Sequence, residues 1–291
     1  MVSDEDAKGE CPIKPILIFG APGSGTTLLF QSLCLHRDLA YTTPNMLRAG
    51  ILRHGRVLGD RRKTLFKLQN IIHRDNISKL PQGDALWVKY FGDYKYLTEY
   101  SYSKDIAAYY RKKVLQVENL WDRSRFVDKT LLHCFRVRLL KLIFPDAKFI
   151  HIIRDGRAVA FSILNKIRIA GDQNPLFRIG FKDILGDNFQ SQRSELYNYG
   201  LGWAEFVKKG REANAFGPSS YHEIRYENLI REPYQELKDV IEFCELDWHR
   251  KIEDNIPLMQ NMNEKWKETS KEQLKDLEES TFELRATLGY A

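Results

Sequence analysis

Short apolar runs alternate along the chain with longer stretches in which apolar residues recur at helical spacing. The segments 15–20 ("PILIFG"), 125–130 ("RFVDKT") and 148–154 ("KFIHIIR") are typical of buried strands, and 219–229 ("SSYHEIRYENL") contains a fourth. Helices are predicted over 26–35, 104–120, 136–144, 155–167, 194–213, 233–246 and 269–290, and 50–80 has interrupted helical character. The last helix opens with a capping-box pattern from Thr269 to Glu272.

This alternation predicts an α/β fold, in which one P-loop-like domain contains a parallel sheet flanked by helices. No repeat, low-complexity tract or linker divides the 291 residues, so we expect a single domain over 1–291, with 1–12 disordered. Ligands of such sheets bind beyond the carboxyl ends of the strands. Motifs at those ends are therefore the first candidates for function.

The stretch "GAPGSGTTLL" follows the first predicted strand and resembles a Walker phosphate-binding loop without its lysine. Gly20 and Gly25 have the Walker spacing and Thr27 fills the last position, but Thr26 stands where the lysine is expected. Glycines let successive backbone N–H groups face one anion, and the following helix presents its positive N-terminus. The hydroxyls of Ser24, Thr26 and Thr27 add donors, although an ordinary tight turn is the alternative.

Two further predicted strands end in basic residues. Arg154 ends "FIHIIR", and Ser162 follows eight residues later, two turns into the next helix. A guanidinium is suited to phosphate oxygens and a serine hydroxyl can add a bond, whereas pairing of Arg154 with Asp155 is the alternative. Lys129 ends another strand and is expected to face the same crevice, unless it is a surface lysine.

Positive charge is concentrated in one segment. The chain has 45 Lys and Arg against 39 Asp and Glu, and eight of the basic residues lie between Arg48 and Arg74, opposed by Asp60 alone. This segment is either a solvated helical face or a surface that attracts an anionic substrate, a membrane or nucleic acid. No nucleic-acid-binding motif accompanies it, so we expect no nucleic-acid partner.

Cysteine spacing and hydropathy bear on cofactors and location. The four cysteines are widely spaced and form no CxxC motif, so neither a metal site nor a disulfide framework is expected. No apolar run approaches the ~20 residues of a transmembrane segment, and the N-terminus lacks the pattern of a signal peptide. We therefore expect a cytoplasmic protein with no transmembrane segment and no metal.

Five segments together resemble the sulfotransferase family that uses 3′-phosphoadenosine 5′-phosphosulfate (PAPS), particularly its bacterial and tyrosylprotein branch. They occur in the family's order: "GSGTTLL", "DKTLL", "FPDAKFIHIIRDGRAVAFS", "YHEIRYENLIREPYQELKDVIEFCEL" and "NMNEKWKETSKEQLKDLEESTFELRATLGY". The resemblance implies a metal-independent, in-line transfer of a sulfuryl group to an acceptor hydroxyl or amine. Adenosine 3′,5′-bisphosphate (PAP) would be the second product.

The resemblance also implies a role for each motif. The glycine-containing loop would hold the 5′-phosphosulfate, the Arg154–Ser162 pair the 3′-phosphate, and Lys129 the transition state. Residues 45–120 would form a helical insertion over the acceptor site, and 250–291 a loop and helix that close over the nucleotide. The implied nucleotide-binding residues are Gly23, Ser24, Gly25, Thr26, Thr27, Arg154, Ser162, Tyr226, Lys265 and Trp266.

The chain departs from the family pattern in two places. Gly23 replaces a basic residue of the loop, and no carboxylate follows the first helix, where the family's usual glutamate base stands. His133, four residues after Lys129, is the nearest candidate base, although a structural histidine is the alternative. Glu118, His54 and His73 are weaker candidates. Arg48 is the first candidate to supply the missing charge to the sulfuryl oxygens or the 5′-phosphate.

Two other functions remain open. A P-loop kinase of small metabolites shares the fold, but the absent Walker lysine and the Arg154–Ser162 pair argue against it. A non-catalytic nucleotide-binding protein would explain both departures from the family. The sequence does not identify the acceptor, which could be a sugar, a phenol, a peptide tyrosine, a lipid or a small metabolite. The basic segment favours an anionic one.

Overall fold

The computed structural model of the protein describes residues 11–43, 46, 84–91, 97–170, 181–254 and 263–290. The basic segment 48–74 lies outside the described residues, and so does Arg48. The predicted insertion, 45–120, is described at 46 and over 84–91 and 97–120.

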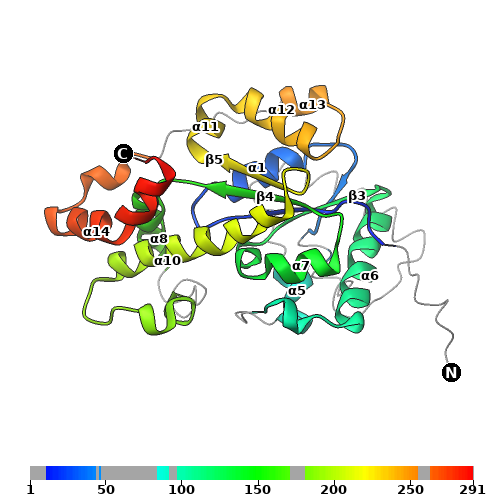
Figure 1. Ribbon diagram of the computed structural model, residues 1–291. Coiled ribbons are helices and arrows are strands. Elements are labelled where there is room, and N and C mark those ends of the chain that lie inside the picture. Colours follow the sequence, from blue (N-terminus) through cyan, green and yellow to red (C-terminus); the bar gives the residue numbers. More distant parts are fainter. Residues whose placement is uncertain are drawn as a thin grey trace.

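In the described part of the chain, the centre of the fold is a parallel five-stranded sheet with the order β2-β3-β1-β4-β5 (Figure 1). The strands are β1 (Ile16–Phe19), β2 (Leu39–Ala40), β3 (Arg125–Lys129), β4 (Lys148–Ile153) and β5 (Tyr221–Arg225). The four strands predicted from the sequence are confirmed. β2 has no counterpart among them, because two residues form no recognisable apolar run.

The central strands are buried along their whole length. Every residue of β1, β3 and β4 is buried, which agrees with the largely apolar sequences of β1 and β4. The pairing places Ile18 beside Lys129, and Phe19 beside His151. It also places Ile153 beside Arg225, so the carboxyl ends of β1, β3, β4 and β5 meet at one edge.

Helices cover both faces of the sheet, as the α/β prediction requires (Figure 1). One face carries α1 (Thr26–Leu33), α11 (Tyr226–Arg231), α12 (Pro233–Phe243) and α13 (Arg250–Glu253). The other carries α5 (Asp84–Phe91), α6 (Lys104–Trp121) and α7 (Val137–Ile143). Short 3₁₀ helices span Glu99–Ser101, Leu131–Arg136, Gly186–Asn188, Glu212–Phe216 and Lys265–Glu268.

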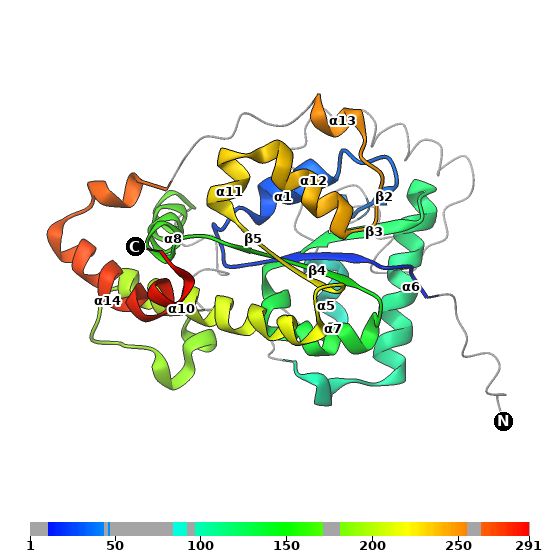
Figure 2. The same cartoon turned by 45° about the horizontal axis from the view of Figure 1, so that its top comes forward.

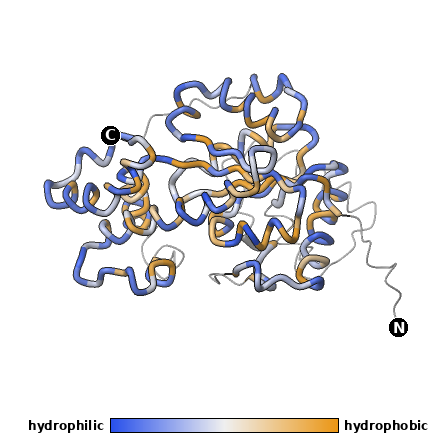
Figure 3. The backbone as a smooth tube through the Cα atoms, viewed as in Figure 1, coloured by the Kyte–Doolittle hydropathy of each residue, from blue (hydrophilic) through white to orange (hydrophobic). Residues whose placement is uncertain are grey.

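Three helices pack together where β4 ends. They are α8 (Gly156–Ala170), α10 (Glu195–Arg211) and α14 (Lys271–Leu288), and α10 continues beneath the sheet (Figure 2). Colouring by hydropathy shows apolar residues gathered on the strands and on the inward sides of the helices (Figure 3). This shared core holds the strand ends in fixed relative positions.

The capping box of α14 lies one residue later than predicted. Ser270, not Thr269, is the N-cap, and its hydroxyl accepts a hydrogen bond from the Gln273 amide. The Gln273 side chain accepts one from the Ser270 amide in return. Thr269 instead donates to the carbonyl oxygen of Trp266, at 2.8 Å. The predicted capping box is therefore present, but its position was wrong by one residue.

Candidate functional site

Four segments singled out in the sequence follow strands that end at the same edge of the sheet. The glycine loop 20–25 follows β1, Lys129 ends β3, Arg154 follows β4 and Tyr226 follows β5. This arrangement agrees with the general position of ligands in open parallel sheets. The sequence motifs therefore lie at one edge of the sheet although they are distant along the chain.

The loop after β1 has the features of an anion-binding turn. Gly25 is the N-cap of α1 with a left-handed φ of 100°, no side chain caps the helix, and its first turn contains no acidic residue. The first N–H groups of α1 therefore face outward beside the positive end of the helix. The Ser24 hydroxyl is buried and has no hydrogen-bond partner among the described residues. A bound anion would satisfy these donors.

Arg154 joins the strand end to this loop. Its guanidinium is almost fully buried and donates from Nη1 to the carbonyl oxygen of Gly23, at 2.9 Å. Nε donates to Oδ1 of Asn263, at 2.6 Å, and the ring of Tyr226 lies 4.3 Å from the guanidinium. Burial lowers the pKa of Arg154 from its usual value. The alternative of an Arg154–Asp155 pair is not observed, because Asp155 pairs with Arg157 at 2.7 Å.

Ser162 and its neighbour one turn later approach the same loop from α8. A Cβ atom added to Gly23 would lie 2.9 Å from the Ser162 hydroxyl oxygen and 3.8 Å from Nζ of Lys166. Gly23 also has a φ of 89°, which side chains rarely tolerate. Close packing of α8 and the backbone conformation thus both require glycine at this position.

The predicted adenine-side residue, Tyr226, packs against the loop. A Cβ atom on Gly25 would lie only 2.6 Å from the Tyr226 ring, so this glycine is required as well. The next residue, Glu227, accepts hydrogen bonds from the Asp155 amide and the Asn263 side chain through Oε1. Its Oε2 accepts one from the Tyr290 hydroxyl, at 2.9 Å. Glu227 thereby fastens the C-terminal segment to the strand ends.

The predicted closing residues lie on a short 3₁₀ helix that packs against α8. The Trp266 ring lies 4.3 Å from the guanidinium of Arg157, and Lys265 is exposed. Arg157 in turn bonds Asp155 and Glu278. Trp266 therefore contacts Arg157, whereas Asn263 of the same segment accepts a hydrogen bond directly from Arg154.

Lys129 and Asp128 emerge from β3 on opposite sides, because successive strand side chains alternate. Asp128 is buried and accepts hydrogen bonds at Oδ2 from Trp87 of α5, from Thr130 and from His133. Lys129 is also buried. The described part of the predicted insertion is thus fixed to the strand that carries Lys129.

His133, the candidate base, has no exposed atom. Its Nε2 lies 3.0 Å from Asp128, and the Trp87 ring packs on it edge to face. Burial lowers the pKa of His133, and its Nδ1 has no hydrogen-bond partner among the described residues. In this position the imidazole contacts Asp128 and Trp87 and is fully buried.

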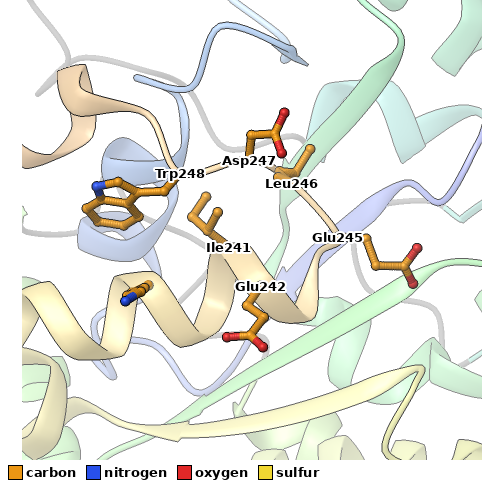
Figure 4. A pocket seen from close by; sticks show the side chains of 7 residues that line it. Ile241, Glu242, Glu245, Leu246, Asp247 and Trp248 are labelled. Atoms are coloured by element: carbon orange, nitrogen blue, oxygen red, sulfur yellow. The ribbon is translucent and has the colours of Figure 1, made fainter.

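A pocket in the described part of the molecule lies away from the carboxyl edge of the sheet. It lies at the end of α12 and is lined by Lys238, Ile241, Glu242, Glu245, Leu246, Asp247 and Trp248 (Figure 4). Glu245 bonds Lys148, the first residue of β4, so this pocket is at the amino edge of the sheet. Its carboxylates point in different directions (Figure 4), and the described residues contain no group of three potential metal ligands.

A comparison with known protein families identifies the family of the chain. A family model described as "Sulfotransferase family" matches residues 15–250. The chain belongs to the sulfotransferase family. The matched region contains the glycine loop, Lys129, the Arg154–Ser162 pair and Tyr226.

Solved structures of sulfotransferases share the fold. The sulfotransferase domain from the curacin biosynthetic pathway matches with a TM-score of 0.55 at 15% identity, covering 96% of this chain and 98% of that one. Sulfotransferase STF9 from Mycobacterium avium matches with a TM-score of 0.55 at 12% identity, covering 98% and 79%. These likenesses establish the sulfotransferase fold for the chain.

Two curated relatives are similar in sequence over part of their length. The omega-hydroxy-beta-dihydromenaquinone-9 sulfotransferase Stf3 of Mycobacterium tuberculosis (strain CDC 1551 / Oshkosh) is 35% identical over 120 residues, 40% of this chain and 27% of that protein. An uncharacterized protein of Aquifex aeolicus is 25% identical over 253 residues, 84% of this chain and 27% of that protein. The chain thus spans about a quarter of the length of these relatives. No helix within the described ranges has the length and apolar character needed to span a membrane.

Three residues of this sulfotransferase join the site without having been predicted. Glu227 lies in "RYENL" and Asn263 in "NMNEKW", so their motifs signalled the region but not the contacts. Lys166 follows Ser162 by four residues, which places both on the same face of α8. That spacing was visible in the sequence, whereas the proximity of Lys166 to Gly23 depends on how α8 packs.

Proposed function

We propose that this sulfotransferase takes its sulfuryl group from PAPS and transfers it in line to an acceptor hydroxyl or amine. The observation that carries the proposal is the hydrogen bond from Arg154 to the Gly23 carbonyl, which makes the two predicted phosphate-binding elements one unit. The buried guanidinium bonds neutral oxygens of Gly23 and Asn263 rather than a carboxylate. A buried cation in this setting is well prepared to accept an anionic group.

The residues present fit a nucleotide with anionic groups at both ends of its ribose. The uncapped N-terminus of α1 and the buried Ser24 hydroxyl suit the 5′-phosphosulfate, with the hydroxyls of Thr26 and Thr27 nearby in the chain. Arg154 and Ser162, which both lie against Gly23, suit the 3′-phosphate. In this proposal Tyr226 borders the adenine, and Lys265 and Trp266 close over the nucleotide.

PAPS supplies an activated sulfuryl group, and the chain's own residues bind it and stabilise the charge that develops. A sulfuryl group carries less negative charge than a phosphoryl group, so backbone amides, hydroxyls and a lysine can serve where kinases use Mg²⁺ and the Walker lysine. Lys129, buried at the end of β3, is proposed to stabilise the bridging oxygen as it becomes the leaving atom. This assignment explains a Thr at position 26.

The proton acceptor is not assigned to His133 in this proposal. A base must come within hydrogen-bond reach of the acceptor, and the His133 ring is enclosed by Asp128 and Trp87. Arg48, proposed from the sequence to supply charge to the sulfuryl oxygens, lies outside the described residues.

The acceptor class can be narrowed by a relative. The name of Stf3 gives a hydroxyl-bearing menaquinone derivative as that protein's substrate, and Stf3 is 35% identical over the 120 residues that match. We propose a hydroxyl as the acceptor of this chain. Transfer of ³⁵S from labelled PAPS to panels of alcohols, phenols, sugars and amines tests this. Sulfation of amines alone would contradict it.

Calorimetric titration with PAP and with AMP tests the proposed donor. Because the 3′-phosphate adds charge-assisted hydrogen bonds, we expect PAP to bind roughly 10- to 100-fold more tightly than AMP. Arg154→Lys keeps the charge but loses the planar fork, so it should remove most of this preference. Equal affinities of the wild-type protein for PAP and AMP would overturn the proposal. Tighter binding of Mg·ATP than of PAP would favour a kinase.

A further inference from the structure

The loop of this sulfotransferase lacks a basic side chain of its own. Gly23 occupies the position at which the family resemblance places one, and neither Ser24 nor Thr26 carries a charge. A lysine could not replace Gly23 in this conformation, because the φ of 89° disfavours a side chain and Ser162 occupies the space that the side chain would need. The charge at this point must therefore come from another element, if it is supplied at all.

Helix α8 brings a lysine to this position. Nζ of Lys166 lies 3.8 Å from the point that a Cβ atom of residue 23 would occupy. Ser162, one turn earlier on the same face of α8, lies against the same point, and Arg154 donates to the carbonyl oxygen of the same glycine. Three donor side chains, one directly after β4 and two on α8, thus lie next to Gly23.

The electrostatic surroundings of Lys166 are those of an anion site. The residue remains exposed, so a ligand can reach it, yet desolvation by the surrounding protein lowers the pKa of Lys166, and the positive charge of Arg154 lowers it further. Within the described ranges no carboxylate forms an ion pair with Lys166. Two neighbouring cations repel each other, and a doubly charged phosphate placed between them would relieve that repulsion.

We propose that Lys166, on helix α8, binds the 3′-phosphate of the nucleotide together with Arg154 and Ser162, and so places a positive charge beside Gly23, where the loop has none. The inference rests on the proposed function, because it takes the anion to be the nucleotide's 3′-phosphate. The 3′ side is favoured over the 5′ side by the position of Lys166 next to Ser162. The uncapped N-terminus of α1 serves the 5′ side.

The test compares two variants that each remove one positive charge from α8. Lys166→Gln removes the proposed ligand, and Arg168→Gln removes an exposed charge two residues later, on a different side of the helix. We expect Lys166→Gln to weaken PAP binding roughly 10- to 100-fold and to leave AMP binding within about twofold, as for loss of one charged hydrogen-bonding group. Arg168→Gln should leave both affinities unchanged. Lys166→Arg, which keeps the charge, should retain most of the PAP affinity.

The outcomes separate this inference from the proposed function. If the wild-type protein does not prefer PAP to AMP, the proposed function fails. If it does prefer PAP and Lys166→Gln binds PAP normally, the proposed function stands and the role of Lys166 is refuted. An equal loss of PAP and AMP affinity would place Lys166 at the 5′ side and overturn the 3′ assignment. An equal loss in Arg168→Gln would show a general effect of charge and would also overturn it.

Discussion

The buried carboxyl group of Glu118 allows a direct test of how burial affects the pH dependence of stability. It lies in the last turn of α6, is 5% exposed, and has an Oε1 atom without a hydrogen-bond partner among the described residues. Burial raises the pKa of Glu118 to about 8, although the charge of Arg125 and a hydrogen bond from the Phe126 backbone oppose the rise. We therefore expect Glu118→Gln, which replaces the carboxyl by a neutral group of similar shape, to stabilise the protein at alkaline pH.

The sign follows from proton linkage. Between pH 4.5 and about 8 the folded protein keeps a proton that the unfolded chain has released, so stability falls as the pH rises through this range. Above about pH 8 both states are ionised and the loss is complete. Since one pKa unit corresponds to ~1.36 kcal/mol, the free energy of unfolding falls by about 5 kcal/mol at most over this interval. The glutamine variant does not ionise and avoids this loss.

Urea unfolding at pH 5 and pH 9 measures the effect. We expect wild type and Glu118→Gln to have similar free energies of unfolding at pH 5, and the variant to be more stable by about 2–5 kcal/mol at pH 9. The control is Glu242→Gln, which removes an exposed carboxylate and should give the same difference at both pH values. If the difference for Glu118→Gln does not change with pH, the carboxyl is solvated in solution and the reasoning is refuted.

Three further predictions concern the site. Lys129→Ala should lower kcat by about 10²–10³ while changing the Kd of PAP little, and an equal loss in both would show that Lys129 only anchors the nucleotide. Gly23→Ala should weaken PAP binding without adding or removing a charge, because of its φ of 89° and its contact with Ser162, and unchanged calorimetry would show that the loop can relax. Turnover should survive EDTA, because a sulfuryl group carries less negative charge than a phosphoryl group, and activity restored only by Mg²⁺ would favour a kinase.

Much of the sheet and the outline of the site could be predicted because both depend on local sequence. Apolar runs that end in glycine or a basic residue marked β1, β3 and β4, and the residues after them carried the recognisable motifs. β2 could not be predicted, because Leu39–Ala40 is a strand only through its pairing with Arg125 and Phe126. The capping box was displaced because Thr269 and Ser270 both fit the local pattern, and only packing decides between them.

The surroundings of His133 could not be predicted for a different reason. A histidine four residues after Lys129 has the spacing of a base that faces an acceptor, and nothing near it in sequence indicates complete burial. Its enclosure depends on Trp87, which comes from α5 and donates to the same Asp128 oxygen. A contact between residues so distant along the chain leaves no periodic pattern in the sequence. The surroundings of a candidate base therefore depend on long-range packing, and so does the position of Lys166.

The position of Lys166 on a helix limits the movement of its ammonium group relative to the glycine loop. Helix α8 is fixed at its start, where Gly156 packs so closely on Trp203 that a Cβ atom would lie 2.5 Å from the indole ring. The same indole donates to the Arg154 carbonyl oxygen, at 3.0 Å, so one tryptophan positions both the strand end and the helix. The same packing positions Ser162 and Lys166, because they lie on consecutive turns of α8. A cation on a packed helix loses less conformational freedom on binding than a cation on a glycine loop. The loop itself can then adopt the backbone geometry that anion binding requires.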